Sequence, residues 1–134
     1  MYLRFGQRDA TMQTALQLVE TEDEIRLNPE MGISEADVHS VRRWLETGEA
    51  VLIDVREASE FENERIPGAL MMPLSFFDGE VFPRLPGVKV VLMCAIGKRS
   101  AAATKQLKNH GYSLPINMVG GLGAWKDAGY PTEV

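Results

Sequence analysis

Cysteine is almost absent from this chain of 134 residues, in which Cys94 is the only one. A single thiol cannot close an internal disulfide, and it cannot supply the several thiolates of a structural zinc site. The two histidines, His39 and His110, provide no cluster of metal ligands. Cys94 is therefore either a small buried hydrophobe or a reactive group, and no metal or cofactor is expected.

Long hydrophobic runs and an excess of positive charge are also missing. No apolar stretch approaches membrane-spanning length, and the first ten residues lack the uninterrupted apolar run of a signal peptide. The chain has 14 Lys and Arg against 19 Asp and Glu, a net charge of −5, whereas a general nucleic-acid binder shows a basic face. We expect a cytoplasmic protein with neither nucleic acid nor membrane among its partners, in a reducing compartment that suits a free thiol.

What the chain does contain fits one globular domain. Apolar residues make up 45% and charged residues 25% of the sequence, and its length suffices for a single core. Residues 1–30 differ from the rest, with a helix predicted over residues 11–19, an acidic run over residues 20–24, and a breaker at Asn28-Pro29. We expect residues 1–30 to form an N-terminal extension, partly ordered or helical, and residues 31–134 to form the domain.

Strand and helix patterns alternate along the rest of the chain. The run Ser34-Glu35-Ala36-Asp37 resembles a capping box, which predicts a helix that begins at Ser34 and ends at Gly48. Short apolar runs predict strands at residues 51–55, 69–72, 88–93 and 116–119. Further helices are predicted at residues 58–64, from Ser100 to Gly111, and around Trp125 as far as Gly129. This alternation indicates an α/β domain with a mainly parallel sheet.

Cys94 follows the strongest predicted strand and immediately precedes a helix. Ligands bind at this end of a strand in open parallel sheets, where loop N–H groups and a helix N-terminus favour an anion. Gly97 permits backbone angles that a side chain would resist, and Lys98 and Arg99 add two cations within the same turn. These features favour the thiolate, which is the nucleophilic form of cysteine.

The loop resembles the active-site loop of the rhodanese-like sulfurtransferases. In that family a glycine lies three positions after the cysteine, and an arginine often lies two positions further on. Two other signatures match in order and spacing, and resemblance extends from about Ile33 to Pro131. The first signature is Leu52-Ile53-Asp54-Val55-Arg56-Glu57, Glu60-Phe61, Ile66-Pro67-Gly68-Ala69 and Pro73; the closing one is Gly120-Gly121, Trp125 and Gly129-Tyr130-Pro131. One departure is Glu64-Arg65, where the family often has glycine and histidine.

The resemblance implies an α/β fold whose mainly parallel, five-stranded sheet has helices on both faces. It implies that Cys94 takes sulfur from a small anionic donor such as thiosulfate, forms a persulfide, and passes the sulfur to a thiol, cyanide or protein acceptor. The loop residues expected to bind the donor are Ala95, Ile96, Gly97, Lys98, Arg99 and Ser100. Which of the two cations points inward is left open. Asp54 and Arg56 are expected to support the loop, although a structural salt link is the plainer interpretation of this pair.

Two alternatives stand beside sulfur transfer. Cysteine phosphatases and arsenate reductases use a similar anion cradle, but their pattern has five residues between cysteine and arginine. Here four residues separate Cys94 from Arg99, and the shorter loop favours a single sulfur atom. The other alternative is a persulfide carrier or docking module for a specific protein partner, and the acidic segment before Asn28 is one place where such a partner could bind.

Overall fold

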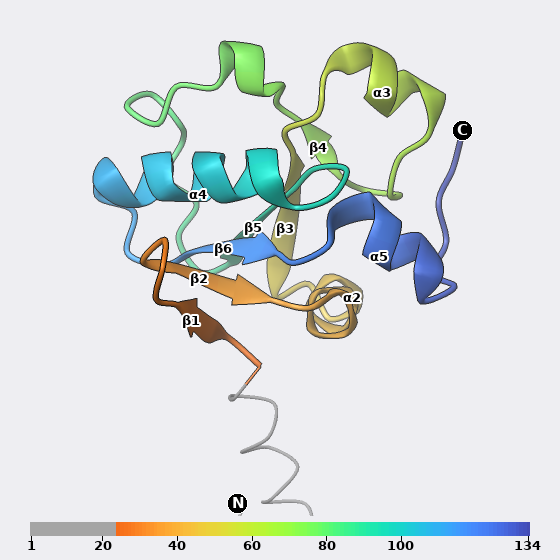
Figure 1. The fold of residues 1–134 in the computed structure, drawn as a ribbon, viewed down its shortest axis with the longest axis horizontal. Helices are drawn as coiled ribbons and strands as arrows, with labels where there is room; N and C mark the ends of the chain where they lie inside the picture. The colour runs from red at the N-terminus through yellow and green to blue at the C-terminus, as the bar shows by residue number, and fades with distance from the viewer. Residues whose placement is uncertain (1–23) are drawn as a thin grey trace, which may run out of the picture.

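A computed structural model describes residues 24–134, and the predicted helix at residues 11–19 lies outside this part (Figure 1). Strands and helices alternate along the chain. The strands are β1 (Arg26–Asn28), β2 (Ile33–Ala36), β3 (Ala50–Asp54), β4 (Leu70–Met71), β5 (Lys89–Met93) and β6 (Pro115–Met118). The helices are α2 (Val38–Glu46), α3 (Ala58–Asn63), the 3-10 turn η1 (Leu74–Phe76), α4 (Lys98–Asn109) and α5 (Gly121–Asp127). The predicted α/β fold is confirmed.

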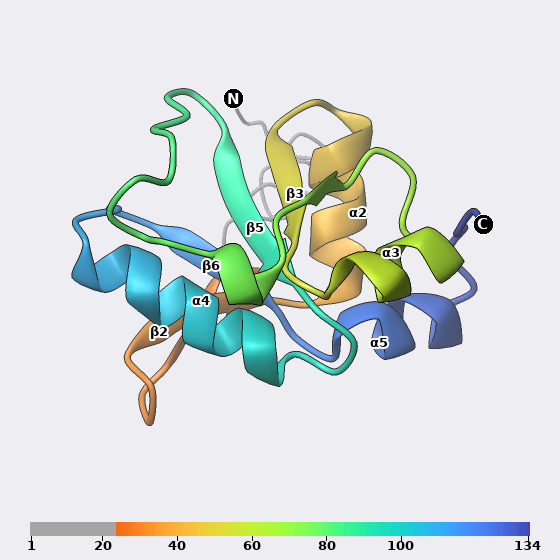
Figure 2. The ribbon, with the colours of Figure 1, turned by 90° about the horizontal axis from the view of Figure 1, so that it is seen from above.

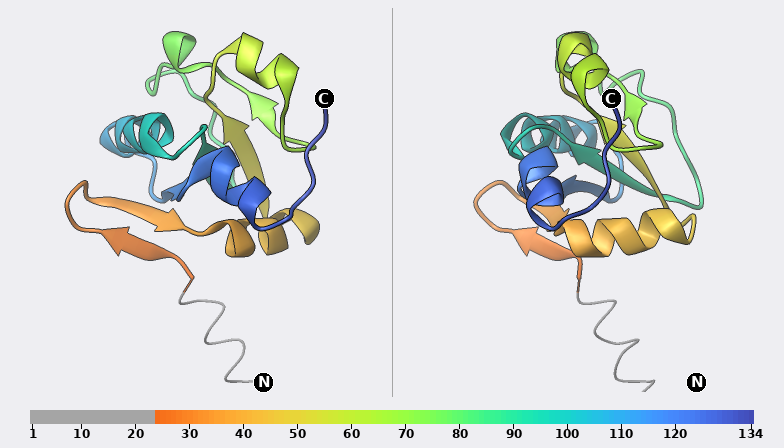
Figure 3. Two further views of the ribbon diagram at one scale, coloured as in Figure 1. Left: turned by 45° about the vertical axis from the view of Figure 1, so that its right-hand side comes forward. Right: turned by 90° about the vertical axis from the view of Figure 1, so that its right-hand side faces the viewer.

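The strands form one sheet in the order β1-β2-β6-β5-β3-β4. All neighbouring strands are parallel except β1 and β2, which form an antiparallel hairpin at the edge opposite α3 (Figure 3). The sheet has six strands, so the expected number of five is wrong. Neither β1 nor β2 is among the four predicted strand ranges, and the register of their hairpin pairs Arg26 with Glu35 and Asn28 with Ile33.

The predicted helix start at Ser34 is also wrong, because Ile33–Ala36 is strand β2. This strand pairs with β6 in parallel, Ser34 beside Ile116 and Ala36 beside Met118, and this long-range pairing overrides the local helix signal. The helix begins after Asp37, whose side chain accepts a hydrogen bond of 2.9 Å from the Ser40 N–H. Asp37 is therefore the N-cap that the capping-box pattern had placed at Ser34.

Helices cover both faces of the sheet, as expected (Figure 2). Leu52, Met93 and Ile116 point to one face, where they pack with Trp44 of α2 and Trp125 of α5. Neighbouring strand residues point to the other face, because side chains alternate along a strand. That second cluster joins Ile53, Val55, Val90, Leu92 and Cys94 to Phe77, Phe82, Ala103 and Leu107. Cys94 thus belongs to the layer between the sheet and α4.

The parallel strands bring several chain segments to one end of the sheet. The carboxyl ends of β3, β5 and β6 lead directly to Asp54, to the Cys94 loop and to the Gly120-Gly121 turn. In the register, Asp54 lies beside Met93, the residue before Cys94. Among residues 24–134, no helix has both the length and the apolar character to cross a bilayer.

Candidate active site around Cys94

The Cys94 side chain lies at the carboxyl end of β5 and is completely buried. Residues 94–97 form a tight loop, and α4 begins directly afterwards at Lys98. Gly97 has a φ of 99°, a left-handed conformation that only glycine adopts readily. A Cβ at this position would also lie 3.1 Å from the Gly120 nitrogen. The loop can therefore curl around the sulfur only with glycine at position 97.

Two backbone N–H donors and one hydroxyl lie close to the Cys94 sulfur. The backbone N–H of Gly97 lies 3.2 Å from Sγ, and the backbone N–H of Ser100 lies 3.3 Å from it. The Ser100 hydroxyl oxygen is a further 3.3 Å contact. These groups form a concave set of donors at the start of α4, where the helix dipole adds partial positive charge. The arrangement is suited to a negatively charged sulfur.

The pKa of the Cys94 thiol reflects two opposing effects. Burial alone raises the pKa, because it disfavours the charged thiolate. Hydrogen bonds from the Ser100 hydroxyl, then from the N–H groups of Ser100, Gly97 and Ile96, outweigh burial and lower the pKa of Cys94 below its ordinary value. The environment therefore favours the nucleophilic form.

The Gly120-Gly121 turn holds the Cys94 loop from behind. The N–H of Leu122 donates to the Cys94 carbonyl at 2.8 Å, and the N–H of Gly123 donates to the Ala95 carbonyl at 3.1 Å. A Cβ on Gly121 would overlap the Cys94 carbonyl oxygen and lie 2.7 Å from the Ala95 carbonyl carbon. With their carbonyls anchored on α5, the loop residues direct their N–H groups toward the sulfur.

The two cations after Gly97 occupy different environments. Lys98 is exposed and makes no ion pair with any residue in the range 24–134. Arg99 instead forms a two-pronged ion pair with Glu60 of α3, with distances of 2.8 and 3.0 Å. This pair lowers the pKa of Glu60 to about 2, and it raises the pKa of Arg99, whose charge the Cys94 thiolate also favours. Arg99 is therefore the cation that is fixed near the sulfur.

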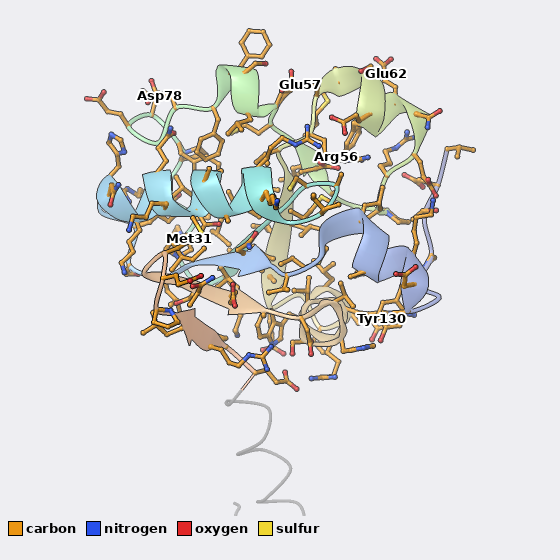
Figure 4. The ribbon with its side chains drawn as sticks, viewed as in Figure 1. Met31, Arg56, Glu57, Glu62, Asp78 and Tyr130 are labelled. Carbon is orange, nitrogen blue, oxygen red and sulfur yellow. The ribbon has the colours of Figure 1, made fainter. Side chains whose placement is uncertain are left out.

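Asp54 and Arg56, the predicted supporting residues, form a buried ion pair. The Arg56 guanidinium donates to Asp54 Oδ2 at 2.8 Å and to the Glu64 carbonyl at 2.8 Å. Figure 4 shows Arg56 just below α3, and its partner Asp54 lies beside Met93, the residue before Cys94. The pair thus fixes the end of α3, and α3 presents Glu60 to Arg99. Its connection to Cys94 is indirect.

The remaining predicted residues lie on the outer side of the Cys94 loop. Ile96, within the loop, is 64% exposed, and Ala95 is half-buried, with its carbonyl bonded to α5. A groove of about 280 Å³ runs along the Ile96, Gly97 and Lys98 side of the loop toward Met31. A larger hollow of about 530 Å³, around Arg84 and Tyr112, contains none of the predicted site residues.

Two residues that contact the site, Glu60 and Asn117, are not predicted from the sequence. Glu60 belongs to a sequence motif that does not reveal its pairing with Arg99, and no motif marks Asn117, which is bonded to the Ser100 hydroxyl at 2.6 Å. An asparagine inside the apolar run of β6 was the available signal. Residues 24–134 contain no group of three or more His, Cys, Asp or Glu side chains that could hold a metal ion.

The sequence and the fold that surround this loop are similar to those of known proteins. A model of the rhodanese-like domain matches residues 37–128. A protein described as a sulfurtransferase in Allochromatium vinosum is 31% identical over 100 residues, which are 74% of this chain and 94% of that protein. An uncharacterised Synechocystis protein is 43% identical over 82 residues, or 61% of this chain, and the chain spans only 46% of its length. The structure of a human single-domain sulfurtransferase superposes with a TM-score of 0.65 at 28% identity, covering 69% of this chain and 95% of the human one.

Proposed function

The chain belongs to the rhodanese-like domain family, and from this membership and the Cys94 geometry we propose that it is a sulfurtransferase. Cys94 is the nucleophile, and the donor is thiosulfate or another small sulfane donor. The sulfur passes to a thiol, to cyanide, or to a cysteine of a protein acceptor. The observation that carries this proposal is the convergence of two N–H groups and a hydroxyl on one buried sulfur.

The first step consumes the donor. The Cys94 thiolate attacks the outer sulfur of thiosulfate, a new S–S bond forms, and the original S–S bond breaks. Sulfite leaves with the electron pair of that bond, and the negative charge of the thiolate passes to the terminal sulfur of the Cys94 persulfide. The loop N–H groups stabilise a negative sulfur without reorganising, which is how preorganised donors lower such barriers.

The second step regenerates the enzyme. An acceptor thiolate or cyanide attacks the terminal sulfur, and the S–S bond of the persulfide breaks. The electron pair returns to Cys94 Sγ, where the same hydrogen bonds receive it. One set of donors therefore serves the resting thiolate and the leaving group of the second step, and no metal or redox partner is required for the balance of either step.

The loop length supports sulfur transfer over phosphate chemistry. Only residues 95–98 separate Cys94 from Arg99, and Arg99 is already engaged by both carboxylate oxygens of Glu60. A cradle of this size, with its arginine neutralised, offers little to a phosphate dianion. Its two inward N–H groups fit a single anionic atom.

Turnover with defined donors and acceptors tests the proposal. We expect thiocyanate from thiosulfate and cyanide, or a persulfidated small thiol when a thiol replaces cyanide. Cys94→Ser should abolish both products, and Lys105→Ala on the exposed part of α4 should retain both. Hydrolysis of an aryl phosphate together with no sulfur transfer from any sulfane donor would refute the proposal in favour of a phosphatase.

A further inference from the structure

Asn117 is a polar residue in the middle of the sheet. It lies in β6 between β2 and β5, pairs with Glu35 and Leu92, and is only 4% exposed. Its neighbours Ile116 and Met118 pack toward α2 and α5, so the Asn117 side chain lies on the opposite face, with α4. Buried side-chain amides are almost always hydrogen-bonded, and the partners of this amide lead directly to the Cys94 loop.

The partners of Asn117 fix the orientation of its amide. One terminal atom faces the Gly97 carbonyl at 3.3 Å, and the other lies 2.6 Å from the Ser100 hydroxyl oxygen. A carbonyl can only accept, so the amide nitrogen must face Gly97 and the amide oxygen must face Ser100. The Ser100 hydroxyl is therefore the donor in the 2.6 Å bond to Asn117.

The Ser100 hydroxyl has a second acceptor within reach. Its oxygen lies 3.3 Å from Cys94 Sγ, and Ser100, like Cys94, is completely buried. A hydroxyl has one proton, so it cannot donate to Asn117 and to the sulfur at the same time. No other side chain is bonded to this hydroxyl within residues 24–134, so the competition involves only these two acceptors.

We propose that Asn117 is a positioning residue that controls the hydrogen bonding of Cys94 by competing for the single proton of the Ser100 hydroxyl. While Asn117 holds that proton, a lone pair of the Ser100 oxygen faces the sulfur and accepts from the neutral thiol. When the thiolate forms, the hydroxyl turns to donate to Sγ, and Asn117 loses its donor. The lost bond opposes ionisation, so Asn117 keeps the pKa of Cys94 higher than the other donors alone would set it.

This competition distinguishes the two forms of the nucleophile, an extension that rests on the proposed sulfur transfer. In the persulfide, the charge resides on the terminal sulfur, and Cys94 Sγ becomes a neutral sulfide. The Ser100 hydroxyl is then free to return to Asn117. Asn117 would thus favour the loaded form over the empty thiolate, because only the loaded form leaves its own hydrogen bond intact.

Other charged groups around the loop stay constant in this argument. They are the Arg99–Glu60 pair from α4 and α3, the Asp54–Arg56 pair at the end of β3, and the exposed Lys98. The Gly97 carbonyl also keeps a donor without Asn117, because the Ala101 N–H lies 3.2 Å from it. Removing the Asn117 amide therefore changes one proton's partner and leaves the charges in place.

The test measures the pH dependence of Cys94 alkylation by iodoacetamide, which requires no sulfur donor. Asn117→Leu should lower the pKa of Cys94 by about one unit, a tenfold change in its ionisation constant, because the Ser100 proton becomes available to the thiolate. Ser100→Ala should raise this pKa. In the Ser100→Ala background, adding Asn117→Leu should change the pKa no further.

That dependence on Ser100 separates positioning from general structural damage. Thr104→Val is the matched control, because it removes another buried hydroxyl bond on α4, to the Ser100 carbonyl at 2.7 Å, and should leave the pKa of Cys94 unchanged. If Asn117→Leu does not fold, the smaller Asn117→Ala carries the same expectation. An equal shift with and without the Ser100 hydroxyl, or no shift at all, would overturn the proposal, while failure of sulfur transfer alone would leave it intact.

Discussion

Replacement of Gly121 by alanine perturbs the Cys94 loop from behind without touching a reacting group. Gly121 has a φ of 60°, so alanine there incurs the left-handed strain of about 1–2 kcal/mol. The new Cβ would also overlap the Cys94 carbonyl oxygen and the Ala95 carbonyl, and overpacking of this kind costs about 1–3 kcal/mol. We expect Gly121→Ala to lose about 2–5 kcal/mol of unfolding free energy in urea denaturation.

Gly48→Ala is the matched control for this variant. Gly48 also has a positive φ, 76°, but no atom lies within 4 Å of the position that its Cβ would take. It should lose only the strain of about 1–2 kcal/mol and keep the wild-type rate of Cys94 alkylation at neutral pH. Gly121→Ala should alkylate more slowly, because the displaced loop stabilises the thiolate less. Equal stability losses and equal alkylation rates in the two variants would refute the role assigned to the Gly120-Gly121 turn.

Three further predictions concern the charged groups of the site. Glu60→Gln, which keeps a capping-box residue at that position, should lower the unfolding free energy by only about 0.5–1 kcal/mol at pH 7, less than the pKa shift alone would give, because more than a third of each side chain is exposed and water screens the pair. Because the pKa of Glu60 is lowered to about 2, the stabilisation that it provides is present above pH 4.5 and declines as the pH falls toward 2. In urea unfolding, the difference in unfolding free energy between wild type and Glu60→Gln should therefore shrink over that range. A difference that stays constant would contradict the ion pair. Lys98→Ala should raise the KM for thiosulfate more than the KM for an uncharged persulfide donor, and it should make the KM for thiosulfate less dependent on ionic strength. Equal effects on both donors would mean that Lys98 does not attract the sulfonate. Asp54→Asn leaves the buried Arg56 guanidinium without its counter-ion and should lower the unfolding free energy by about 3–5 kcal/mol, whereas a loss below 1 kcal/mol in urea denaturation would show that the pair is not buried as described.

The nucleophilic loop was predictable because its determinants are consecutive in the sequence. A strand end, Cys94, Gly97 and the start of a helix lie within a few residues, and the parallel sheet then fixes where they point. The alternation of strands and helices was predictable for the same reason, since each element has its own local pattern, whereas helices on both faces followed only from the family resemblance. Local patterns and their order along the chain are thus sufficient to predict where in the fold the site lies.

What lay beyond the sequence was the set of partners that the fold brings together. Nothing near Arg99 shows that Glu60, 39 positions away, neutralises it, and nothing near Ser100 indicates Asn117, 17 positions away. The wrong helix start at Ser34 has a similar origin, because the parallel pairing of β2 with β6 decides the conformation of that segment. Strand β1 was missed for another reason: its three residues, paired with β2 at the edge of the sheet, are too few to show the alternation of apolar and polar side chains that predicts a strand.

The intact mass of the protein after incubation with thiosulfate tests the central claim most directly. The account predicts an increase by the mass of one sulfur atom, located on the peptide that contains Cys94 and reversed by cyanide. Cys94→Ser should show no increase, and Ser100→Ala should form the adduct more slowly because its thiolate is less stabilised. A protein that gains no sulfur from thiosulfate or from any persulfide donor, or gains it equally in Cys94→Ser, would contradict the account.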